Sequence, residues 1–222
     1  EADINTLAIQ GPKSFKLMEE VFGKEITKLK FFKFDFFNFK NNKYLISRSG
    51  FSKQGGYEVH IDNIDAGLLL YDHLFNIGNK YNLKPGAPNH AERIEGGLLS
   101  YGNDMLINDN PFECGFENSV HLDTNIEFLG KESLKKIKTK GINKKLMGVK
   151  IDTKELGLTD VQLLDTNNNI IGELRSAAFS PTFKKIVGIA MVNKDFCKNY
   201  QKFNMKIKDN LITGSIYNFP IL

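Results

Sequence analysis

The residues of this chain that could do chemistry lie in one short stretch, SRSGFSKQGGYEVHI, residues 47–61. Two glycines precede a segment in which apolar and polar residues alternate, with Tyr57 and Val59 on one side and Glu58 and His60 on the other. An alternation of period two predicts a strand with one buried and one accessible face. The pattern therefore places an acid and an imidazole next to each other on the accessible face.

A carboxylate on a rigid strand can accept two parallel hydrogen bonds from a group that offers adjacent N–H donors. A guanidinium offers such a pair, and so does the 2-amino-4-oxo edge of a pterin. Gly55 and Gly56 would let a flat ring approach the backbone, because no Cβ stands in the way. The alternative is that Glu58 points to water on an exposed strand face, and the alternation by itself favours this alternative.

Other catalytic motifs are absent from the sequence. It contains no phosphate-binding Gly-Lys loop, no Gly-x-Ser-x-Gly turn and no His-Glu-x-x-His helix. The four histidines are scattered, so we expect no metal site. Cys114 and Cys197 show neither metal-ligand nor redox spacing, and each is typical of a small buried hydrophobe. A Cys–His nucleophile pair stays open, but we identify no catalytic residue from the sequence.

Composition restricts the class of protein. The chain has 222 residues, of which 41% are hydrophobic and 25% charged, as in globular proteins. The formal charge of +4 comes from 30 basic and 26 acidic residues and does not indicate nucleic-acid binding. No apolar run approaches the roughly 20 residues that span a membrane, and EADINTLAIQGP does not resemble a secretory leader. We expect a cytoplasmic protein that binds neither nucleic acid nor membrane.

The elements around the glycine-rich stretch can be predicted from periodicity. A helix is expected between Pro12 and Gly23, and a long helix over residues 62–82, capped by Asp62 or Asn63. The aromatic stretch LKFFKFDFFNFK, residues 29–40, should be a strand whose phenylalanines fill the core. The alternative is that these rings stack on a ligand.

The character of the sequence changes near residue 143. From KKLMGVKID onwards, short alternating segments separated by turn residues predict several strands and a small barrel or sandwich. We therefore predict an α+β fold with two domains, residues 1–143 and an all-β domain over residues 144–222. The start, INTLAIQGP, is typical of a strand already in progress, so we expect the chain to be the later part of a longer protein.

Five stretches carry a resemblance to a known family: LAIQGPKS, SRSGFSKQGGYEVHI, ERIEGGLLSYGNDM, NPFECGFENSVHLD with FLGKESL, and GELRSAAFSPTFKKIVGIAMV. In this order they resemble the tetrahydrofolate-dependent aminomethyltransferase family, which includes the glycine-cleavage T-protein. SGFSKQGGYE and ERIEGGLLSYGND are most similar to the bacterial dimethylsulfoniopropionate demethylases. The resemblance implies a partial folate-binding domain followed by a β-barrel, roughly the last three-fifths of such a protein.

The resemblance also implies a reaction. A methyl group would move from the sulfonium of dimethylsulfoniopropionate to tetrahydrofolate, giving methylmercaptopropionate and 5-methyltetrahydrofolate. The sulfonium carbon is already electrophilic because a neutral thioether leaves, so the enzyme mainly has to align the two reactants and exclude water. Such a positioning mechanism needs no strong base and no covalent intermediate. The implied partners are a small sulfonium substrate and tetrahydrofolate, and a homodimer is left open.

Site residues follow by position from the resemblance. The expected folate contacts are Glu58, Arg93, Tyr57 and Tyr101, and the expected substrate contacts are Phe51, His60 and Ser52. Aromatic faces can hold a sulfonium as they hold quaternary ammonium. His60 stands where the demethylases usually carry Tyr. Arg93 could instead form a structural salt bridge with Glu92 or Glu95, while Tyr101 and Glu113 could support a domain interface.

Two other functions share this architecture. Aminomethyl transfer in glycine cleavage uses a different one-carbon donor and a lipoyl-carrier protein. A non-catalytic folate-binding family that maintains iron–sulfur proteins carries a Lys-x-Gly-Cys-Tyr-x-Gly-Gln-Glu stretch, and the comparable NDNPFECGFE lacks it. The family's first portion, with an acidic residue near folate N10, is not in these residues. The activity is therefore predicted for the parent protein.

Overall fold

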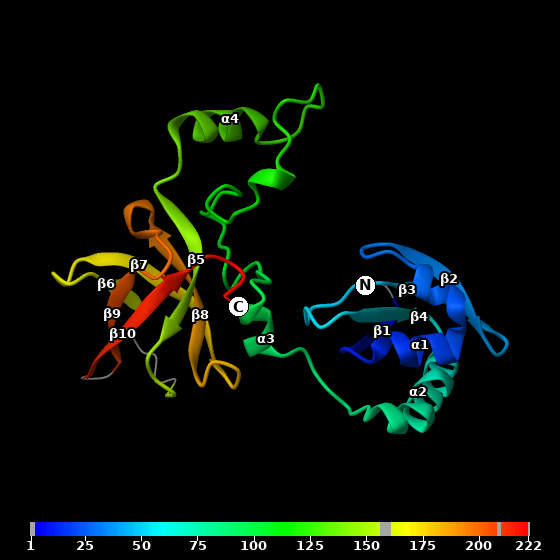
Figure 1. Cartoon of the computed structure of the whole chain (residues 1–222). Coiled ribbons are helices and arrows are strands. Elements are labelled where there is room, and N and C mark those ends of the chain that lie inside the picture. The colour runs from blue at the N-terminus through cyan, green and yellow to red at the C-terminus, as the bar shows by residue number, and fades with distance from the viewer. Residues whose placement is uncertain (1–2, 156–160, 208–209, 222) are drawn as a thin grey trace. The chain divides into compact units, whose positions relative to one another are not determined.

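The structure is a computed structural model, and it describes residues 3–155, 161–207 and 210–221. The chain divides into two compact units, Glu1–Asn89 and His90–Leu222 (Figure 1). The first unit combines helices with a sheet, and the second contains a closed β-barrel. The α+β prediction, with a barrel in the later part of the chain, is confirmed.

A four-stranded antiparallel sheet forms the first unit, in the order β1-β4-β3-β2. Its strands are β1 (Asn5–Gln10), β2 (Phe34–Phe39), β3 (Asn42–Ser47) and β4 (Gly56–Ile61). β2, β3 and β4 follow one another as neighbours, whereas β1 pairs with β4 from the far side. The strand that comes first in the sequence thus lies beside the one that comes last.

Two helices of this unit cover one face of the sheet. They are α1 (Ser14–Phe22) and α2 (Ile64–Gly78), with short 3₁₀ turns η1 (Lys24–Lys28) and η2 (Asn79–Tyr81). α2 begins after Asn63, whose side chain accepts a hydrogen bond from the backbone N–H of Ala66. This cap satisfies one of the free N–H groups of the first turn and confirms Asn63 as one of the two predicted caps.

The side chains of β4 point alternately to the two faces of the sheet, as the sequence predicts. Tyr57, Val59 and Ile61 are buried in the core with α1 and α2, whereas Glu58 and His60 are half-buried on the other face. The periodicity of this strand was therefore sufficient to separate its core side from its accessible side.

The expectation that all phenylalanines of residues 29–40 lie in a strand and fill the core is wrong. Phe32 is not in a strand, and Phe34 and Phe36 are 67% and 53% exposed. Of the phenylalanines described in this stretch, Phe37 and Phe39 pack with the core. The physical reason is that α1 and α2 cover only one face of the sheet within this unit.

The second unit contains α3 (His90–Glu95), η3 (Glu117–Ser119) and α4 (Lys131–Lys140), followed by a six-stranded closed barrel in the order β10-β5-β8-β7-β6-β9. The strands are β5 (Lys144–Ile151), β6 (Gln162–Leu164), β7 (Ile170–Ser180), β8 (Lys185–Asn193), β9 (Lys202–Ile207) and β10 (Asn210–Tyr217), with η4 (Lys194–Phe196) after β8. All pairings that the structure describes in the barrel are antiparallel.

The barrel has apolar residues on both sides of its wall. One cluster fills its interior, and a second lies outside it, where Ile94 of α3 packs with Leu146, Val187 and Ile189. α3 and parts of the segment that follows it therefore pack with the barrel. The predicted domain limit at residues 143/144 coincides with the start of the barrel strands, whereas the compact units divide at Asn89/His90.

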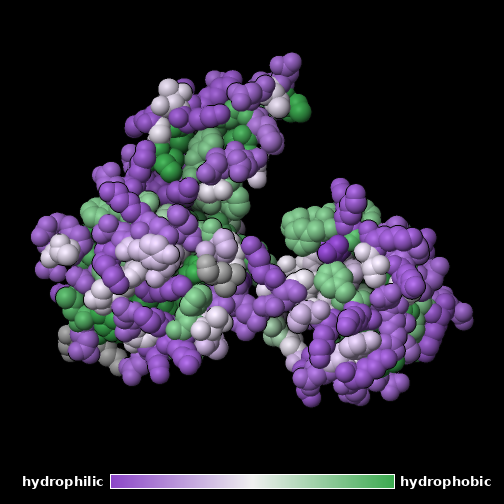
Figure 2. Space-filling model, viewed as in Figure 1, coloured by the Kyte–Doolittle hydropathy of each residue, from purple (hydrophilic) through white to green (hydrophobic). Residues whose placement is uncertain are grey.

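On the face shown in Figure 2, both units are mainly hydrophilic, with hydrophobic residues in limited areas. Within the described ranges, none of the helices combines the length and the apolar character that a membrane span requires. The same residues contain no group of three or more His, Cys, Asp or Glu side chains placed to hold a metal ion.

Candidate functional site

The face of the first sheet opposite α1 and α2 carries the residues around which the site is built, and we call it the open sheet face. Cross-strand pairing sets its side chains in two rows across the four strands. One row is Ala8, Glu58, Ser47 and Phe34, and the other is Thr6, His60, Leu45 and Phe36. The acid and the imidazole are thus central, with phenylalanines on the edge strand β2.

Glu58 is held by a single neighbour. Its side chain is half-buried, and its Oε2 accepts a short hydrogen bond from the hydroxyl of Ser49. Among the residues that the structure describes, this is the one hydrogen bond recorded to the carboxylate. A carboxylate has about four acceptor positions, so Glu58 retains the capacity to bind a donor pair from a ligand.

His60 is linked to Glu58 through hydroxyl groups. Its Nδ1 lies 3.4 Å from Thr6 Oγ1, and its Nε2 lies 3.3 Å from Ser47 Oγ. Ser47 Oγ is in turn 2.7 Å from the hydroxyl of Ser49. The prediction named His60 but missed the two serines, which place acid and imidazole in one network.

Gln10 of β1 fixes the loop before β4. Its Nε2 donates to the carbonyl oxygens of Ser49 (3.0 Å) and Tyr57 (3.2 Å), and its Oε1 accepts from Ser52 Oγ (2.8 Å). Ser52, a predicted substrate contact, therefore uses its hydroxyl to hold the loop to β1. Phe51, beside it, is 44% exposed and available to a ligand.

The structure explains the glycines of this stretch differently from the sequence analysis. Gly55 and Gly56 were expected to let a ring approach. A Cβ on Gly56 would lie 2.3 Å from the carbonyl oxygen of Ile9, and a Cβ on Gly50 would lie 2.1 Å from Gln10 Oε1. Gly55 has φ +77°, a conformation that favours glycine. Close packing against β1 therefore accounts for Gly50 and Gly56.

Tyr57 lies on the other side of the sheet. It is 0% exposed, and its hydroxyl donates to the carbonyl of Ile26 at 3.3 Å. Burial raises the pKa of its phenol, which stays protonated at neutral pH. Tyr57 was predicted as a folate contact, but its position in the core separates it from Glu58, and we leave it out of the proposed site.

Arg93 is part of a buried cluster in the second unit. Its guanidinium donates from Nη1 to Asp104 Oδ2 (2.7 Å) and to the carbonyl of Leu98 (3.0 Å), from Nη2 to Ser176 Oγ (3.1 Å), and from Nε to His90 Nδ1 (3.1 Å). Arg93 forms an ion pair with Asp104, an acid that the sequence analysis did not name as its partner. Four of its five N–H donors are used within the protein, which favours the structural alternative for Arg93.

The remaining predicted positions of the second unit do not form a cluster with Arg93. Tyr101 is 68% exposed and forms an isolated bridge with Met105. Glu113 is buried, and its Oε2 accepts from the backbone N–H of Asn110 at 3.1 Å. Both arrangements agree with a supporting role.

The two thiols are unsuited to nucleophilic catalysis. Burial raises the pKa of Cys114 to about 11, and nearby acids add to the effect. Burial also raises the pKa of Cys197. Since the thiolate is the reactive form, a Cys–His nucleophile pair is not supported.

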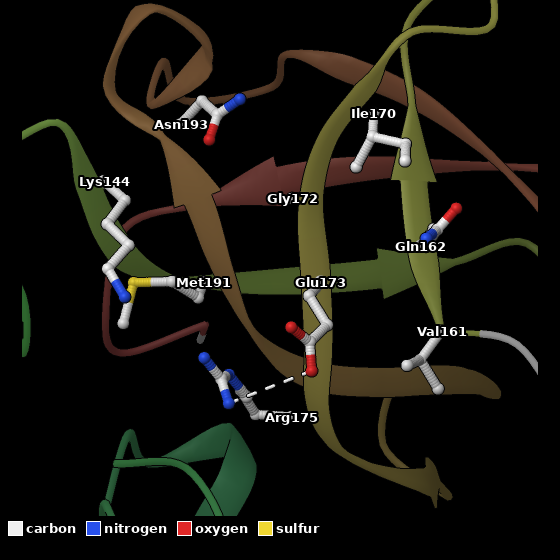
Figure 3. Close-up of a pocket in the computed structure, with 9 residues that line it drawn as sticks. All are labelled: Lys144, Val161, Gln162, Ile170, Gly172, Glu173, Arg175, Met191 and Asn193. Carbon is white, nitrogen blue, oxygen red and sulfur yellow. Dashed lines mark ion pairs between the residues drawn. The ribbon is translucent and has the colours of Figure 1, made fainter. Parts of the chain in front are cut away.

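A pocket lies on the barrel (Figure 3). This pocket of about 350 Å³ is lined by Lys144, Val161, Gln162, Ile170, Gly172, Glu173, Arg175, Met191 and Asn193. Arg175 lies 3.8 Å from both Glu173 and Asp109, and Lys144 lies 2.6 Å from Asp109. The positive groups already have acidic partners, and the pocket contains none of the predicted site residues.

Comparisons with known proteins cover both parts of the chain. The GCVT N-terminal domain matches residues 1–124, and the glycine cleavage T-protein C-terminal barrel domain matches residues 144–221. Dimethylsulfoniopropionate demethylase of Ruegeria pomeroyi is 35% identical over 197 residues, which are 87% of this chain and 53% of that protein. An aminomethyltransferase of Halothermothrix orenii is 30% identical over 218 residues, 97% of this chain and 60% of that protein.

The chain therefore spans only about half to three-fifths of the length of these relatives. Among solved structures, aminomethyltransferase T of the glycine cleavage system from Bartonella henselae superposes with a TM-score of 0.72 at 15% identity, over 100% of this chain and 84% of that one. This similarity shows the fold alone.

Proposed function

This chain belongs to the glycine cleavage T-protein family, and we propose that the protein containing it transfers a methyl group from dimethylsulfoniopropionate to tetrahydrofolate. The observation that carries the proposal is the carboxylate of Glu58, which is half-buried on the open sheet face and has one hydrogen-bond partner recorded. The choice of sulfonium donor rests on the 35% identity to the demethylase. The products would be methylmercaptopropionate and 5-methyltetrahydrofolate.

The open sheet face fits the amino edge of a reduced folate. Glu58 would accept two parallel hydrogen bonds from the N–H groups of the pterin. The hydroxyl of Ser49 would hold the carboxylate in one orientation. Tetrahydrofolate supplies the nucleophilic nitrogen when bound. Since the carboxylate stands on β4 in the middle of a packed sheet, its position is fixed by the core beneath it.

Aromatic side chains on the first unit suit a cationic donor. Phe34 occupies the row of Glu58, and Phe51 lies in the loop that carries Ser49. Phe36 is less available because Lys43 Nζ already lies 4.5 Å from its ring centroid. A sulfonium held over an aromatic face is stabilised by the ring quadrupole. We assign Phe51 and Phe34 to the donor side of the site.

The decisive experiment uses the complete protein that contains this chain. Purified protein is incubated with tetrahydrofolate and dimethylsulfoniopropionate, and both expected products are measured by mass spectrometry. Equal amounts of the two products, formed without any carrier protein, would support the proposal. Consumption of neither substrate would exclude it. The proposal includes a cytoplasmic location and leaves a homodimer open.

Aminomethyl transfer is the second candidate. The similarity to the aminomethyltransferase of Halothermothrix orenii covers 97% of this chain, whereas the similarity to the demethylase covers 87%. Aminomethyl transfer requires an aminomethyl group presented by a lipoyl-carrier protein. Formation of methylenetetrahydrofolate only in the presence of such a carrier, with no reaction of the sulfonium, would select this alternative.

A further inference from the structure

Five polar side chains, four on the open sheet face and one in the loop before β4, form one line of hydrogen bonds, which we call the hydroxyl line. It runs from Thr6 on β1 to His60 on β4, then through Ser47 at the end of β3 and Ser49 in the loop to Glu58. Three of its members, all hydroxyls, can donate and accept, whereas an ionised carboxylate can only accept. The carboxylate at one end therefore sets the direction of every bond in the line.

The direction follows from counting hydrogens. Ser49 donates its one hydroxyl hydrogen to Glu58, so between the two serines, 2.7 Å apart, Ser47 must be the donor. Ser47 also lies 3.5 Å from the carbonyl of Glu58, a longer alternative for the same hydrogen. With its hydrogen used towards Ser49, Ser47 accepts from His60. The neutral imidazole then carries its hydrogen on Nε2 and its lone pair on Nδ1.

The surroundings of Nδ1 suit both charge states of the ring. Thr6 Oγ1, 3.4 Å away, can donate to the lone pair of the neutral ring and can accept from the N–H of the charged ring. The charged residues sharing this face with His60 in the described part of the sheet are Glu58 on its own strand and Lys43 on β3, with Asp62 just beyond the end of β4. His60 can therefore take up a proton without losing a hydrogen bond.

The spacing of Glu58 and His60 matches a flat bicyclic ligand. Residues two apart on a strand point to the same face and stand about 7 Å apart along it. This separation is comparable with the length of two fused six-membered rings. A ring system gripped by Glu58 at one edge and lying along β4 would bring its opposite edge close to His60.

We propose that His60 Nδ1 accepts the proton that the methyl-accepting nitrogen must lose, and that Glu58 sets the tautomer of His60 through Ser49 and Ser47. The catalytic part of this role rests on the proposed function. The nitrogen lone pair forms the new N–C bond, and the S–C bond breaks with its electron pair left on sulfur. The proton of the nitrogen passes to Nδ1 by way of the Thr6 hydroxyl, which takes this proton as it gives its own hydrogen to the ring, and the ring later releases a proton to water.

The tautomer can be measured without turnover. The complete protein is labelled with ¹⁵N-histidine, and the imidazole signals of His60 are identified by their loss in His60→Phe. We expect the Nε2–H tautomer in the unsubstituted protein. In Ser47→Ala and Ser49→Ala the line is cut at different links, so the Nδ1–H form should increase in both variants. His121→Gln, at an exposed position of the second unit, serves as the control and should leave the His60 signals unchanged.

The catalytic part is measured as the rate of methyl transfer at saturating concentrations of both substrates. His60→Phe should lower kcat about 100-fold, as is usual for loss of a general base. Ser47→Ala keeps the ring and should lower kcat by less. The Kd for tetrahydrofolate should change little in His60→Phe, because Glu58 retains Ser49.

The outcomes separate the two proposals. An Nδ1–H tautomer in the unsubstituted protein, or no change in both serine variants, would overturn the assignment of the hydroxyl line. Equal kcat in His60→Phe would overturn the role as proton acceptor. If the complete protein transfers no methyl group, the proposed function and the catalytic role both fail, while the tautomer result still decides the hydroxyl line.

Discussion

Two carboxylates of this protein, Glu58 in the first unit and Asp104 in the second, differ in how far their hydrogen-bonding capacity is used. Asp104 is 0% exposed; Oδ2 accepts from Arg93 Nη1 and the Ser100 N–H, both at 2.7 Å, and Oδ1 accepts from Ser176 Oγ at 2.5 Å. Glu58 is half-buried with one recorded partner. The first arrangement holds structure together, whereas the second leaves an acceptor for a ligand.

The comparison shows that an acid beside a histidine or an arginine does not by itself mark a functional site. Arg93 and Asp104 satisfy each other and join α3 to β7 through Ser176. Glu58 is oriented by a neutral hydroxyl, and no ion pair to its carboxylate is found in the part of the chain that the structure describes. Both residues are acids, so residue type does not distinguish them. They differ because Glu58 keeps free hydrogen-bond acceptor positions on a rigid strand.

The largest effect is expected from Asp104→Ala. Removing the acid leaves the buried Arg93 guanidinium without its counterion, which in other proteins costs about 3–5 kcal/mol. Chemical denaturation followed by circular dichroism should show this loss of unfolding free energy. In Glu58→Gln the loss should be about 1 kcal/mol or less, since one hydrogen bond at a half-buried site is altered. Equal losses in the two variants would contradict the comparison.

Ligand binding, unlike stability, should be affected strongly by Glu58→Gln. Glu58→Gln replaces one acceptor oxygen by a donor and removes the charge, so a two-point contact worth about 1.5–3 kcal/mol would be lost. The Kd of the complete protein for tetrahydrofolate, measured by calorimetry, should rise roughly 10- to 100-fold. Glu20→Gln provides a matched control, because Glu20 bonds to Lys80 and Tyr81 in the same unit. Unchanged affinity in Glu58→Gln would remove Glu58 from the site.

The smallest effect concerns a third acid, Asp109, whose side chain is 1% exposed. Burial by itself would raise its pKa, but hydrogen bonds from Lys144 and from the N–H of Leu106, with the charge of Arg175, bring the pKa below its ordinary value of 3.8. A lowered native pKa adds stability above pH 3.8 that is lost as the pH falls through the native value. Asp109→Asn should therefore flatten the decline of unfolding free energy below pH 4 in denaturation series.

Much of the fold could be predicted because local periodicity agrees with the final packing. The alternation in β4 separated Glu58 and His60 from the core, and Asn63 was one of two predicted caps of α2. The phenylalanines of β2 could not be assigned in this way. Hydrophobic residues stand on both sides of that strand, and only the position of the helices decides which side is buried.

The site was only partly predictable for a related reason. Glu58, His60 and Phe51 stand out because of their alternation and neighbouring glycines, but Ser47, Ser49 and Gln10 look like ordinary polar residues. Ser47 meets Glu58 through the pairing of β3 with β4, and Gln10 meets the loop through the pairing of β1 with β4. Strand register, which the sequence does not state, brings them together.

The contacts of Gln10 have a consequence for how the first unit folds. The loop that carries Ser49 and Ser52 is held by a side chain about 40 positions earlier in the chain, so its shape cannot be completed by the β3–β4 hairpin alone. Contacts this distant in sequence require closure of a long loop and form slowly. The arrival of β1 at the sheet edge would therefore complete the proposed ligand-binding surface and, through Ile9, the core in one step.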